Sequence, residues 1–173
     1  RHYPAVDWTE SFSGYVSPPA KWWQHNVDRT WAAKRAEALA LLSQAEELSR
    51  IVNLVGVEAL SAAQRWTLEG AGLIKEGVLQ QSALDEADSY CSPEKQFLLL
   101  DLSLDIYHEG MDLLETGVPV QQLLALPLLS QARRYKSKYR SENLEGLKAC
   151  RDDVRATFGR LRTEYAKPTE RAR

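Results

Sequence analysis

The stretch SPEKQFLLLDLSLDIYHEGMDLLETG, residues 92–117, decides the expected fold. Ser92 suits an N-cap and Pro93 the first helical position, so a helix is predicted to begin there and to end at Gly117. Its apolar residues recur every three or four positions and form two stripes. The first stripe is Phe97, Leu100, Leu104, Tyr107, Met111 and Leu114, and the second is Leu98, Leu102, Ile106 and Leu113. A helix that is apolar on two sides needs neighbours on both, so we expect it at the centre of a helical bundle.

Similar patterns predict further helices before and after this stretch. We expect long helices over about residues 30–53, 61–80 and 141–165, a short helical turn at Trp22 and Trp23, and short helices near 120–124 and from Pro127. Gly56 should end the first long helix, and Ser61 should cap the second by its side chain alone, without a capping box. Glycines 70, 72 and 77 weaken that second helix, so they are expected where another helix approaches closely.

No strand pairs and no internal repeats are apparent along the sequence. The predicted fold class is therefore all-α, an antiparallel helical bundle with an extended, aromatic-rich N-terminal lead-in. Residues 1–19 form this lead-in, residues 20–165 the helical domain, and residues 166–173 a polar tail that we expect to fray. The lead-in has no helical period and starts with Arg1, so we expect it to continue a preceding domain.

The composition limits the classes of function. The 173 residues carry a formal net charge of −2, which argues against binding of nucleic acid by a broad basic field. Cys91 and Cys150 are too few for a disulfide framework and are expected to be buried thiols. No run of about 18 apolar residues is present, so direct membrane insertion is not expected, and the first residues do not resemble a signal peptide.

The sequence lacks the motifs of common catalytic sites. There is no GxxxxGK[ST] phosphate loop, no GxSxG elbow and no HExxH, CxxC or EF-hand pattern, so no catalytic residue and no metal ligand is assigned. Asp85, Glu86 and Asp88 could imitate a metal site, but a solvated loop before the next helix is favoured. The basic run 133–140 contains two tyrosines and resembles an RNA-binding strip, but a solvated loop or a protein-contact patch is favoured. His108 lies beside the apolar stripes and is interpreted as a structural helix histidine.

Four segments resemble, in order, the C-terminal region of the catalytic A subunit of V/A-type ATPases. They are RHYPAVDWTESFSGY at residues 1–15, IVNLVGVEAL at 51–60, LQQSALDEADSYCSPEKQ at 79–96 and GVPVQQLLALP at 117–127. The first segment is similar to the family's Pro-Ala-Ile-Asn-Trp stretch, which favours the catalytic subunit over the related non-catalytic one. Residues 128–173 resemble the family only loosely.

The resemblance implies that the turn between two long helices contacts the central rotating stalk. The residues concerned are Asn53, Leu54, Val55 and Gly56. Leu54 and Val55 could press on a partner coiled coil, so the turn is expected to project from one end of the bundle. The alternative is an ordinary corner between two helices.

The resemblance also implies a contact with nucleotide. Leu84 and Gln81 are the residues assigned to this contact, and Leu84 occupies the position of a family aromatic residue that walls the adenine pocket. Leucine covers a base by apolar contact but does not stack on it, a difference of ~1–3 kcal/mol where stacking is lost outright. Asp85 also replaces a family histidine. We expect Leu84 to be exposed on a different surface from the 53–56 turn.

The function implied by the resemblance is torque transmission in a rotary ATPase or ATP synthase. ATP or ADP with Mg²⁺ would bind an upstream phosphate-loop domain, and bending of the bundle would turn the stalk and drive proton or sodium transport. The implied partners are the chain's own nucleotide-binding domain, the central-stalk subunits and the non-catalytic B subunit, in a cytoplasmic head peripheral to the membrane.

The 173 residues by themselves are expected to carry no cofactor and not to hydrolyse ATP, because they lack a phosphate loop. Two alternatives stay open. One is a free-standing helical protein-interaction domain without catalytic activity, for which the likeness would be a coincidence of helix punctuation. The other is a small metal-dependent enzyme that uses Asp85, Glu86 and Asp88.

Overall fold

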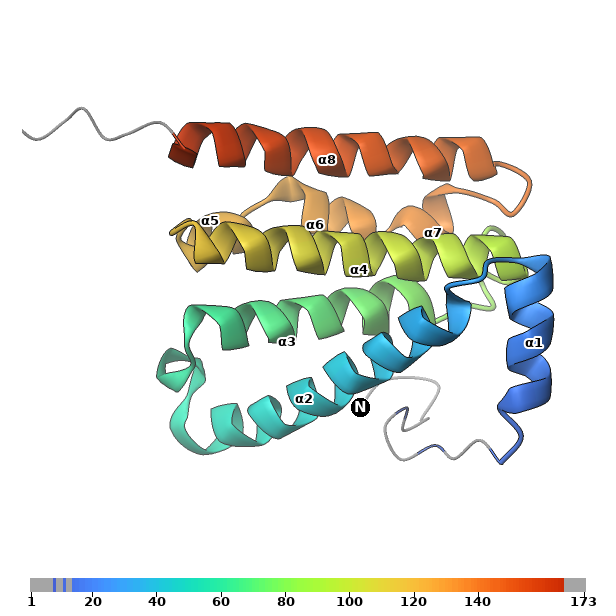
Figure 1. Cartoon of the computed structure of the whole chain (residues 1–173), viewed down its shortest axis with the longest axis horizontal. Helices are drawn as coiled ribbons and strands as arrows, with labels where there is room; N and C mark the ends of the chain where they lie inside the picture. Colours follow the sequence, from blue (N-terminus) through green and yellow to red (C-terminus); the bar gives the residue numbers. More distant parts are fainter. Residues whose placement is uncertain (1–7, 9–10, 12–13, 167–173) are drawn as a thin grey trace, which may run out of the picture.

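The computed structural model describes Trp8, Ser11 and residues 14–166. These residues are mostly helical and include no strand, which confirms the all-α class (Figure 1). The helices are α1 (Ser17–Asn26), α2 (Trp31–Val55), α3 (Ala62–Ile74), α4 (Pro93–Glu115), α5 (Val120–Leu124), α6 (Pro127–Ala132), α7 (Tyr135–Lys138) and α8 (Leu144–Ala166). Two shorter segments, η1 (Val57–Ala59) and η2 (Lys75–Leu79), lie directly before and after α3.

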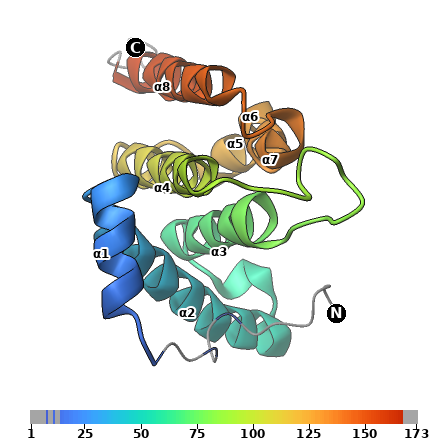
Figure 2. The ribbon, with the colours of Figure 1, turned by 90° about the vertical axis from the view of Figure 1, so that its right-hand side faces the viewer.

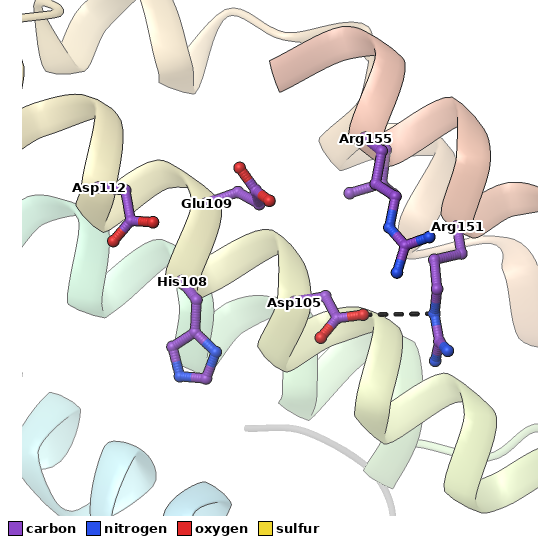
Figure 3. A pocket seen from close by; sticks show the side chains of 7 residues that line it. Asp105, His108, Glu109, Asp112, Arg151 and Arg155 are labelled. Carbon is purple, nitrogen blue, oxygen red and sulfur yellow. Dashed lines mark ion pairs between the residues drawn. The ribbon is translucent and has the colours of Figure 1, made fainter. Parts of the chain in front are cut away.

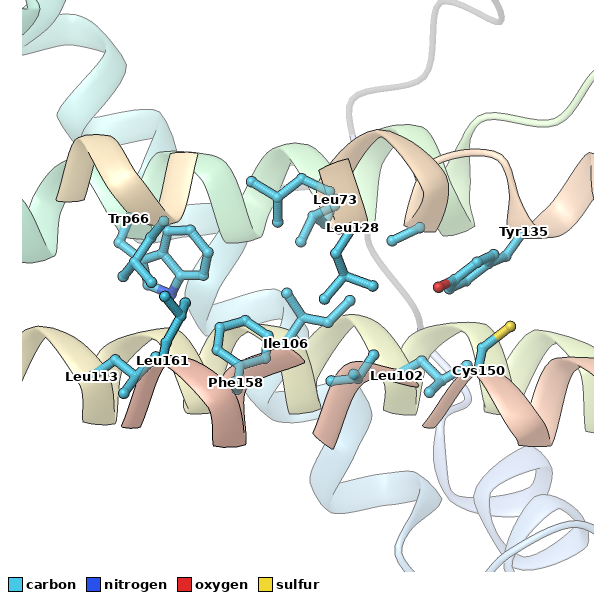
Figure 4. Packing of buried hydrophobic residues seen from close by; sticks show 14 of the residues in the cluster. Trp66, Leu73, Leu102, Ile106, Leu113, Leu128, Tyr135, Cys150, Phe158 and Leu161 are labelled. Carbon is cyan, nitrogen blue, oxygen red and sulfur yellow. The ribbon is translucent and has the colours of Figure 1, made fainter. Parts of the chain in front are cut away.

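Helix α4 lies at the centre of the bundle, as its two apolar stripes predict. In two views it has α3 and α2 on one side and α8 on the other (Figures 1 and 2). Leu104, Ile106 and Leu113 are completely buried. One buried cluster joins α4 to α3, α5, α6, α7 and α8, and a second joins it to α2 and α3. Figure 4 shows the first cluster, in which Phe158 and Leu161 of α8 lie among residues of α3 and α4.

The long helices do not all alternate in direction. α3 runs antiparallel to both α2 and α4, as expected, but α8 runs parallel to α4 (Figure 1). The ion pairs between α4 and α8 follow this direction, since Arg151 pairs with Asp101 and the later Arg162 pairs with the later Glu109. The parallel arrangement arises because the short helices α5, α6 and α7 return the chain along the bundle before α8 begins.

Side-chain contacts fix the first turns of α3 and α4. The hydroxyl of Ser61 accepts a hydrogen bond from the Gln64 amide (3.3 Å), and the Gln64 side chain accepts one from the Ser61 amide (2.9 Å). This is a capping box, so the prediction that Ser61 acts alone was wrong, because Gln64 stands at the required third position. The hydroxyl of Ser92 accepts from the Lys95 amide (3.2 Å), and Pro93 follows it as predicted.

The end of the second long helix differs from the prediction. α3 ends at Ile74, and the chain continues as a π-helical turn in η2. Gly77 of this turn lies against the backbone of Ala132 and Arg133, where a Cβ would come within 3.6 Å of the Ala132 carbonyl oxygen. Helical periodicity cannot reveal a contact between residues so distant in the sequence. The short helix α7, which follows Ala132 and Arg133, was also not predicted.

The N-terminal lead-in passes into helix earlier than expected. α1 begins at Ser17, so the last three residues of the lead-in are helical rather than extended. Within α1 and α2, the rings of Trp23 and Trp31 stack with centroids 5.1 Å apart. The lead-in residues 1–7, 9–10 and 12–13 and the tail 167–173 lie outside the described residues.

Two glycines admit aromatic rings between α3 and α4. A Cβ at Gly70 would come within 2.6 Å of the Tyr107 ring, which confirms the expected close approach at this glycine. A Cβ at Gly110 would come within 2.1 Å of the Trp66 ring. The buried indole of Trp66 also donates a hydrogen bond to the Tyr107 carbonyl oxygen at 2.8 Å. The two helices are therefore joined by apolar contact and by one directional bond.

The substitution Gly110→Ala is expected to lower the free energy of unfolding by about 1–3 kcal/mol, because the added methyl group overlaps the Trp66 indole. Urea denaturation of the 173-residue chain, followed by tryptophan fluorescence, measures this. The matched control is Gly159→Ala in α8, where no other described side chain or distant backbone atom lies within 4 Å of the new Cβ. Alanine favours helix there by about 0.5–1 kcal/mol. Equal effects of the two substitutions would contradict this packing.

Candidate functional site

The turn between α2 and α3 lies at one end of the bundle (Figure 1). Several apolar side chains are exposed there. Gly56 ends α2 with a φ of 86°, a conformation that glycine adopts without strain. The exposed fractions around it are 42% for Ile51, 84% for Leu54, 64% for Val55 and 44% for Val57. We call residues 51–57 the tip. Neighbouring apolar side chains with this exposure are typical of a surface that contacts a partner.

All four residues of the predicted stalk contact lie at the tip. Asn53, Leu54, Val55 and Gly56 are exposed. The segment that follows is anchored by an ion pair of 2.7 Å between Glu58 and Arg65, which joins η1 to the second turn of α3. The tip is thus a short, braced turn between two long helices.

The 80–91 loop joins η2 to α4 at the other end of α3 (Figure 1). Leu84 is 99% exposed there, and Tyr90 is 66% exposed. The Asp85 carboxylate next to Leu84 accepts hydrogen bonds from the amides of Ala87 (2.9 Å) and Asp88 (3.2 Å), which closes a turn. Leu84 therefore projects from an ordered turn on a different surface from the tip, as expected from the sequence.

Polar contacts inside the 80–91 loop join its first and last residues. The Asp88 side chain is buried and accepts a hydrogen bond from the Ser82 amide at 2.7 Å. The side-chain amide of Gln81 donates to the Asp88 carbonyl oxygen at 2.6 Å. Gln81, the second predicted nucleotide contact, thus has its amide nitrogen engaged within the loop, while Leu84 lies between the joined ends.

A fully buried lysine lies beneath this loop. Lys95, in the first turn of α4, is 0% exposed, and its ammonium donates to the carbonyl oxygens of Ala87 (2.7 Å) and Lys136 (2.8 Å). Lys95 was not singled out from the sequence. The available signal was its position one turn before the buried Leu99, which places it on the covered side of α4.

The acidic and basic groups of this region pair mainly with each other. Arg140 pairs with Glu86, and the Lys136 ammonium lies 3.6 Å from the Asp88 carboxylate and donates to the Gln80 carbonyl oxygen. Arg133 pairs with Glu69 at 2.7 Å and with Glu76 at 2.8 Å. Three of the five cations in the basic run therefore form ion pairs within the domain, and the ammonium of Lys138 lies over the ring of Tyr139. Among the described residues, no group of three or more His, Cys, Asp or Glu side chains is placed to bind a metal ion.

A charged groove of about 150 Å³ lies between α4 and α8 (Figure 3). Burial raises the pKa of the Asp105 carboxyl, and the neighbouring Asp101 carboxylate adds to this shift. Arg151 opposes this rise in the pKa, because its guanidinium lies 3.3 Å from the Asp105 carboxylate. Arg151 also pairs with Asp101, and the Lys34 ammonium of α2 lies 3.0 Å from the same Asp101 carboxylate. These ion pairs join α2, α4 and α8.

His108, which also lines this groove, is half-exposed and pairs with Glu37 of α2. It joins two helices, which agrees with its interpretation as a structural histidine. Cys91 and Cys150 are both free thiols; Cys150 is buried, and Cys91 is only partly so. Within the described part of the chain, no helix is both long and apolar enough to cross a membrane.

A family model described as the C-terminal domain of V and A type ATP synthase matches residues 20–124. The matched segment covers more than half of the chain and runs from α1 to the end of α5, so it includes both the tip and the 80–91 loop. The chain belongs to this family. The likeness found in the sequence is therefore not a coincidence of helix punctuation.

Curated relatives extend the V/A-type ATP synthase match over nearly the whole chain. The V-type ATP synthase alpha chain of Nitrosococcus oceani is 62% identical over 166 residues, which are 96% of this chain and 28% of that protein. The A subunit of the A-type ATP synthase of Ignicoccus hospitalis is 41% identical over 160 residues, 91% of this chain and 26% of that protein. The chain thus spans about a quarter of the length of these relatives. Because 166 of the 173 residues align, the match includes most of α6, α7 and α8.

The exposure of Leu54 and Leu84 predicts that both side chains can be changed without loss of fold. Leu54→Ala and Leu84→Ala are each expected to change the free energy of unfolding by less than about 0.5 kcal/mol, as surface substitutions do. Leu104→Ala, at a completely buried position of the central helix, is the control and should cost about 2–5 kcal/mol. Chemical denaturation of the three variants measures the difference. A large loss on Leu84→Ala would show that the side chain packs inside the domain.

Proposed function

We propose that this chain is the part of a V/A-type ATP synthase A subunit that couples the nucleotide site to the central stalk. The observation that supports this most directly is the exposed apolar tip at the end of a two-helix hairpin, in a domain of this family. ATP or ADP with Mg²⁺ would bind the nucleotide-binding domain of the same subunit, and that domain would supply the chemistry. The residues of this chain complete the adenine wall and transmit the resulting movement.

The hairpin of α2 and α3 is suited to transmitting force. α2 has 25 residues and so extends about 37 Å. Its buried face, which includes Leu41, Leu42 and Ala45, packs in one cluster with Ala71 and Ile74 of the returning helix. Because interiors packed in this way are hardly compressible, a displacement at one end of the hairpin is carried to the other. The apolar side chains of the tip would then press on the stalk.

The 80–91 loop is proposed to complete the adenine pocket. Leu84 would cover the base by apolar contact, with Gln81 beside it in the wall. Support comes from the 99% exposure of Leu84 on an ordered turn, which leaves its side chain available to a neighbouring domain. The leucine also predicts a weaker grip on the base than an aromatic side chain would give, since leucine does not stack.

The proposed partners follow from these two surfaces. The chain's own nucleotide-binding domain would cover the 80–91 loop, the central-stalk subunits would contact the tip, and the non-catalytic B subunit would lie beside the catalytic one in the head. The head would be cytoplasmic and peripheral to the membrane, and its rotation would be coupled to transport of protons or sodium ions. Negative net charge and the internal pairing of the basic run argue against a nucleic-acid partner.

Substitution of Leu84 tests the nucleotide contact. In the full-length subunit within its assembled complex, Leu84→Phe is expected to lower the KM for ATP by about fivefold or more, because a ring can stack on the base. Leu84→Ala is expected to raise the KM by about threefold or more through lost apolar contact. Steady-state ATP hydrolysis measures both. The same KM for all three side chains would overturn the assignment of Leu84.

Charged substitutions test the contact of the tip with the stalk. The double variant Leu54→Asp, Val55→Asp should reduce ATP-driven ion transport by about tenfold or more while ATP is still hydrolysed, because carboxylates cannot be buried against an apolar partner without a large cost. Transport into vesicles and ATP hydrolysis are measured on the same preparation. The control, Ser43→Asp with Gln44→Asp, places the same charge on exposed positions of α2 away from the tip. Equal loss of transport in the two would count against the tip.

A further inference from the structure

We propose that Lys95 and Lys136 are positioning residues that fix the place of Leu84 and thereby set the affinity of the intact subunit for its nucleotide. This inference rests on the proposed function of Leu84. The side chain of Leu84 is 99% exposed, so packing within the domain hardly constrains it. Its position depends instead on the backbone of the 80–91 loop, and the two lysines contact that backbone on both sides of Leu84.

The lysine contacts bracket the segment that carries Leu84. The Lys136 ammonium donates to the Gln80 carbonyl oxygen before Leu84, and the Lys95 ammonium donates to the Ala87 carbonyl oxygen after it, at 2.7 Å. The second bond of the Lys95 ammonium, 2.8 Å to the Lys136 carbonyl oxygen, joins the two lysines. We call this connected set the lysine clamp. It links the start of α4 to α7 and to both halves of the loop.

Lys95 occupies a position where a lysine lowers stability unless its ammonium bonds to the loop carbonyl oxygens. Burial of an ammonium group costs free energy that only good polar partners offset. A cation in the first turn of a helix also faces the positive end of the helix dipole. An apolar residue would fill the same space on the covered side of α4, but it would leave the carbonyl oxygens of Ala87 and Lys136 without this donor. The chemistry of Lys95 therefore matches the loop carbonyls rather than the apolar core.

Lys136 contributes an ion pair to the clamp as well as a hydrogen bond. Its ammonium lies 3.6 Å from the Asp88 carboxylate, which itself accepts the Ser82 amide at 2.7 Å. Both side chains are largely shielded from water, with 13% of Lys136 and 4% of Asp88 exposed. The Asp88 carboxylate and the Lys136 ammonium thus join residues before Leu84, Gln80 and Ser82, to Asp88 after it. An arginine at position 136 would keep the cation, whereas a methionine would not.

The test uses the full-length subunit in its assembled complex and measures KM and kcat for ATP hydrolysis. Lys95→Met is expected to raise the KM by about three- to tenfold, with a smaller change in kcat. Lys136→Met should also raise the KM, whereas Lys136→Arg should keep the KM close to that of the unchanged protein. The matched control is Lys34→Met, which removes a lysine of α2 that pairs with Asp101 of α4. It is expected to lower stability but to leave the KM unchanged.

Combination with Leu84→Ala separates the clamp from the role of Leu84. If the clamp acts through Leu84, the KM of the double variant Lys95→Met, Leu84→Ala should equal that of Leu84→Ala, since the two changes are not independent. An unchanged KM in Leu84→Ala alone would sink the proposed function of the loop. Two outcomes would overturn the clamp but leave the role of Leu84 intact. In both, Leu84→Ala raises the KM, and either Lys95→Met leaves the KM unchanged or the KM increases of the two substitutions multiply in the double variant. If Lys95→Met prevents assembly, the comparison of Lys136→Met with Lys136→Arg decides.

Discussion

Helix α4 carries apolar side chains around most of its circumference, and the removal of that surface from water is the constraint on which the other helices depend. Each completely buried leucine or isoleucine there contributes about 1.5–3 kcal/mol relative to an exposed side chain. Leu104 packs in the cluster with α2 and α3, whereas Ile106 and Leu113 pack in the cluster that includes α8. One layer of α2 and α3 is not enough to cover α4, so the chain must supply α8 on the opposite side. The short helices between them provide the return path.

This constraint explains which parts of the fold are predictable from the sequence. α4 begins and ends where Ser92, Pro93 and Gly117 indicate, because those signals act within one turn of the chain. The π-helical turn after Ile74 was not predicted, since it depends on contacts of Gly77 with residues more than fifty positions later. The direction of α8 was also missed, because periodicity reports which face of a helix is buried and not which way the helix runs.

The candidate site also contains features that local sequence predicts and features that depend on contacts between distant residues. The tip and Leu84 were predicted from the resemblance of their segments to the family, and both are exposed as expected. Lys95 was not found, since a lysine in a first turn is ordinarily solvated and its partner carbonyl in Lys136 lies 41 positions away. The acidic loop residues were expected in water, but Asp88 is buried, because its partners Ser82 and Lys136 are brought to it by the folded loop and by α7.

The near-complete exposure of Leu84 has a consequence for how this domain can change over evolutionary time. A side chain that packs on little of its own domain can be replaced without a compensating change in the core. The packing of this domain therefore does not restrict natural variation at this position, whereas variation at Gly110 is tied to the ring of Trp66. One domain thus contains a position where a residue can change alone and a position, Gly110, where a larger residue requires a smaller side chain at Trp66.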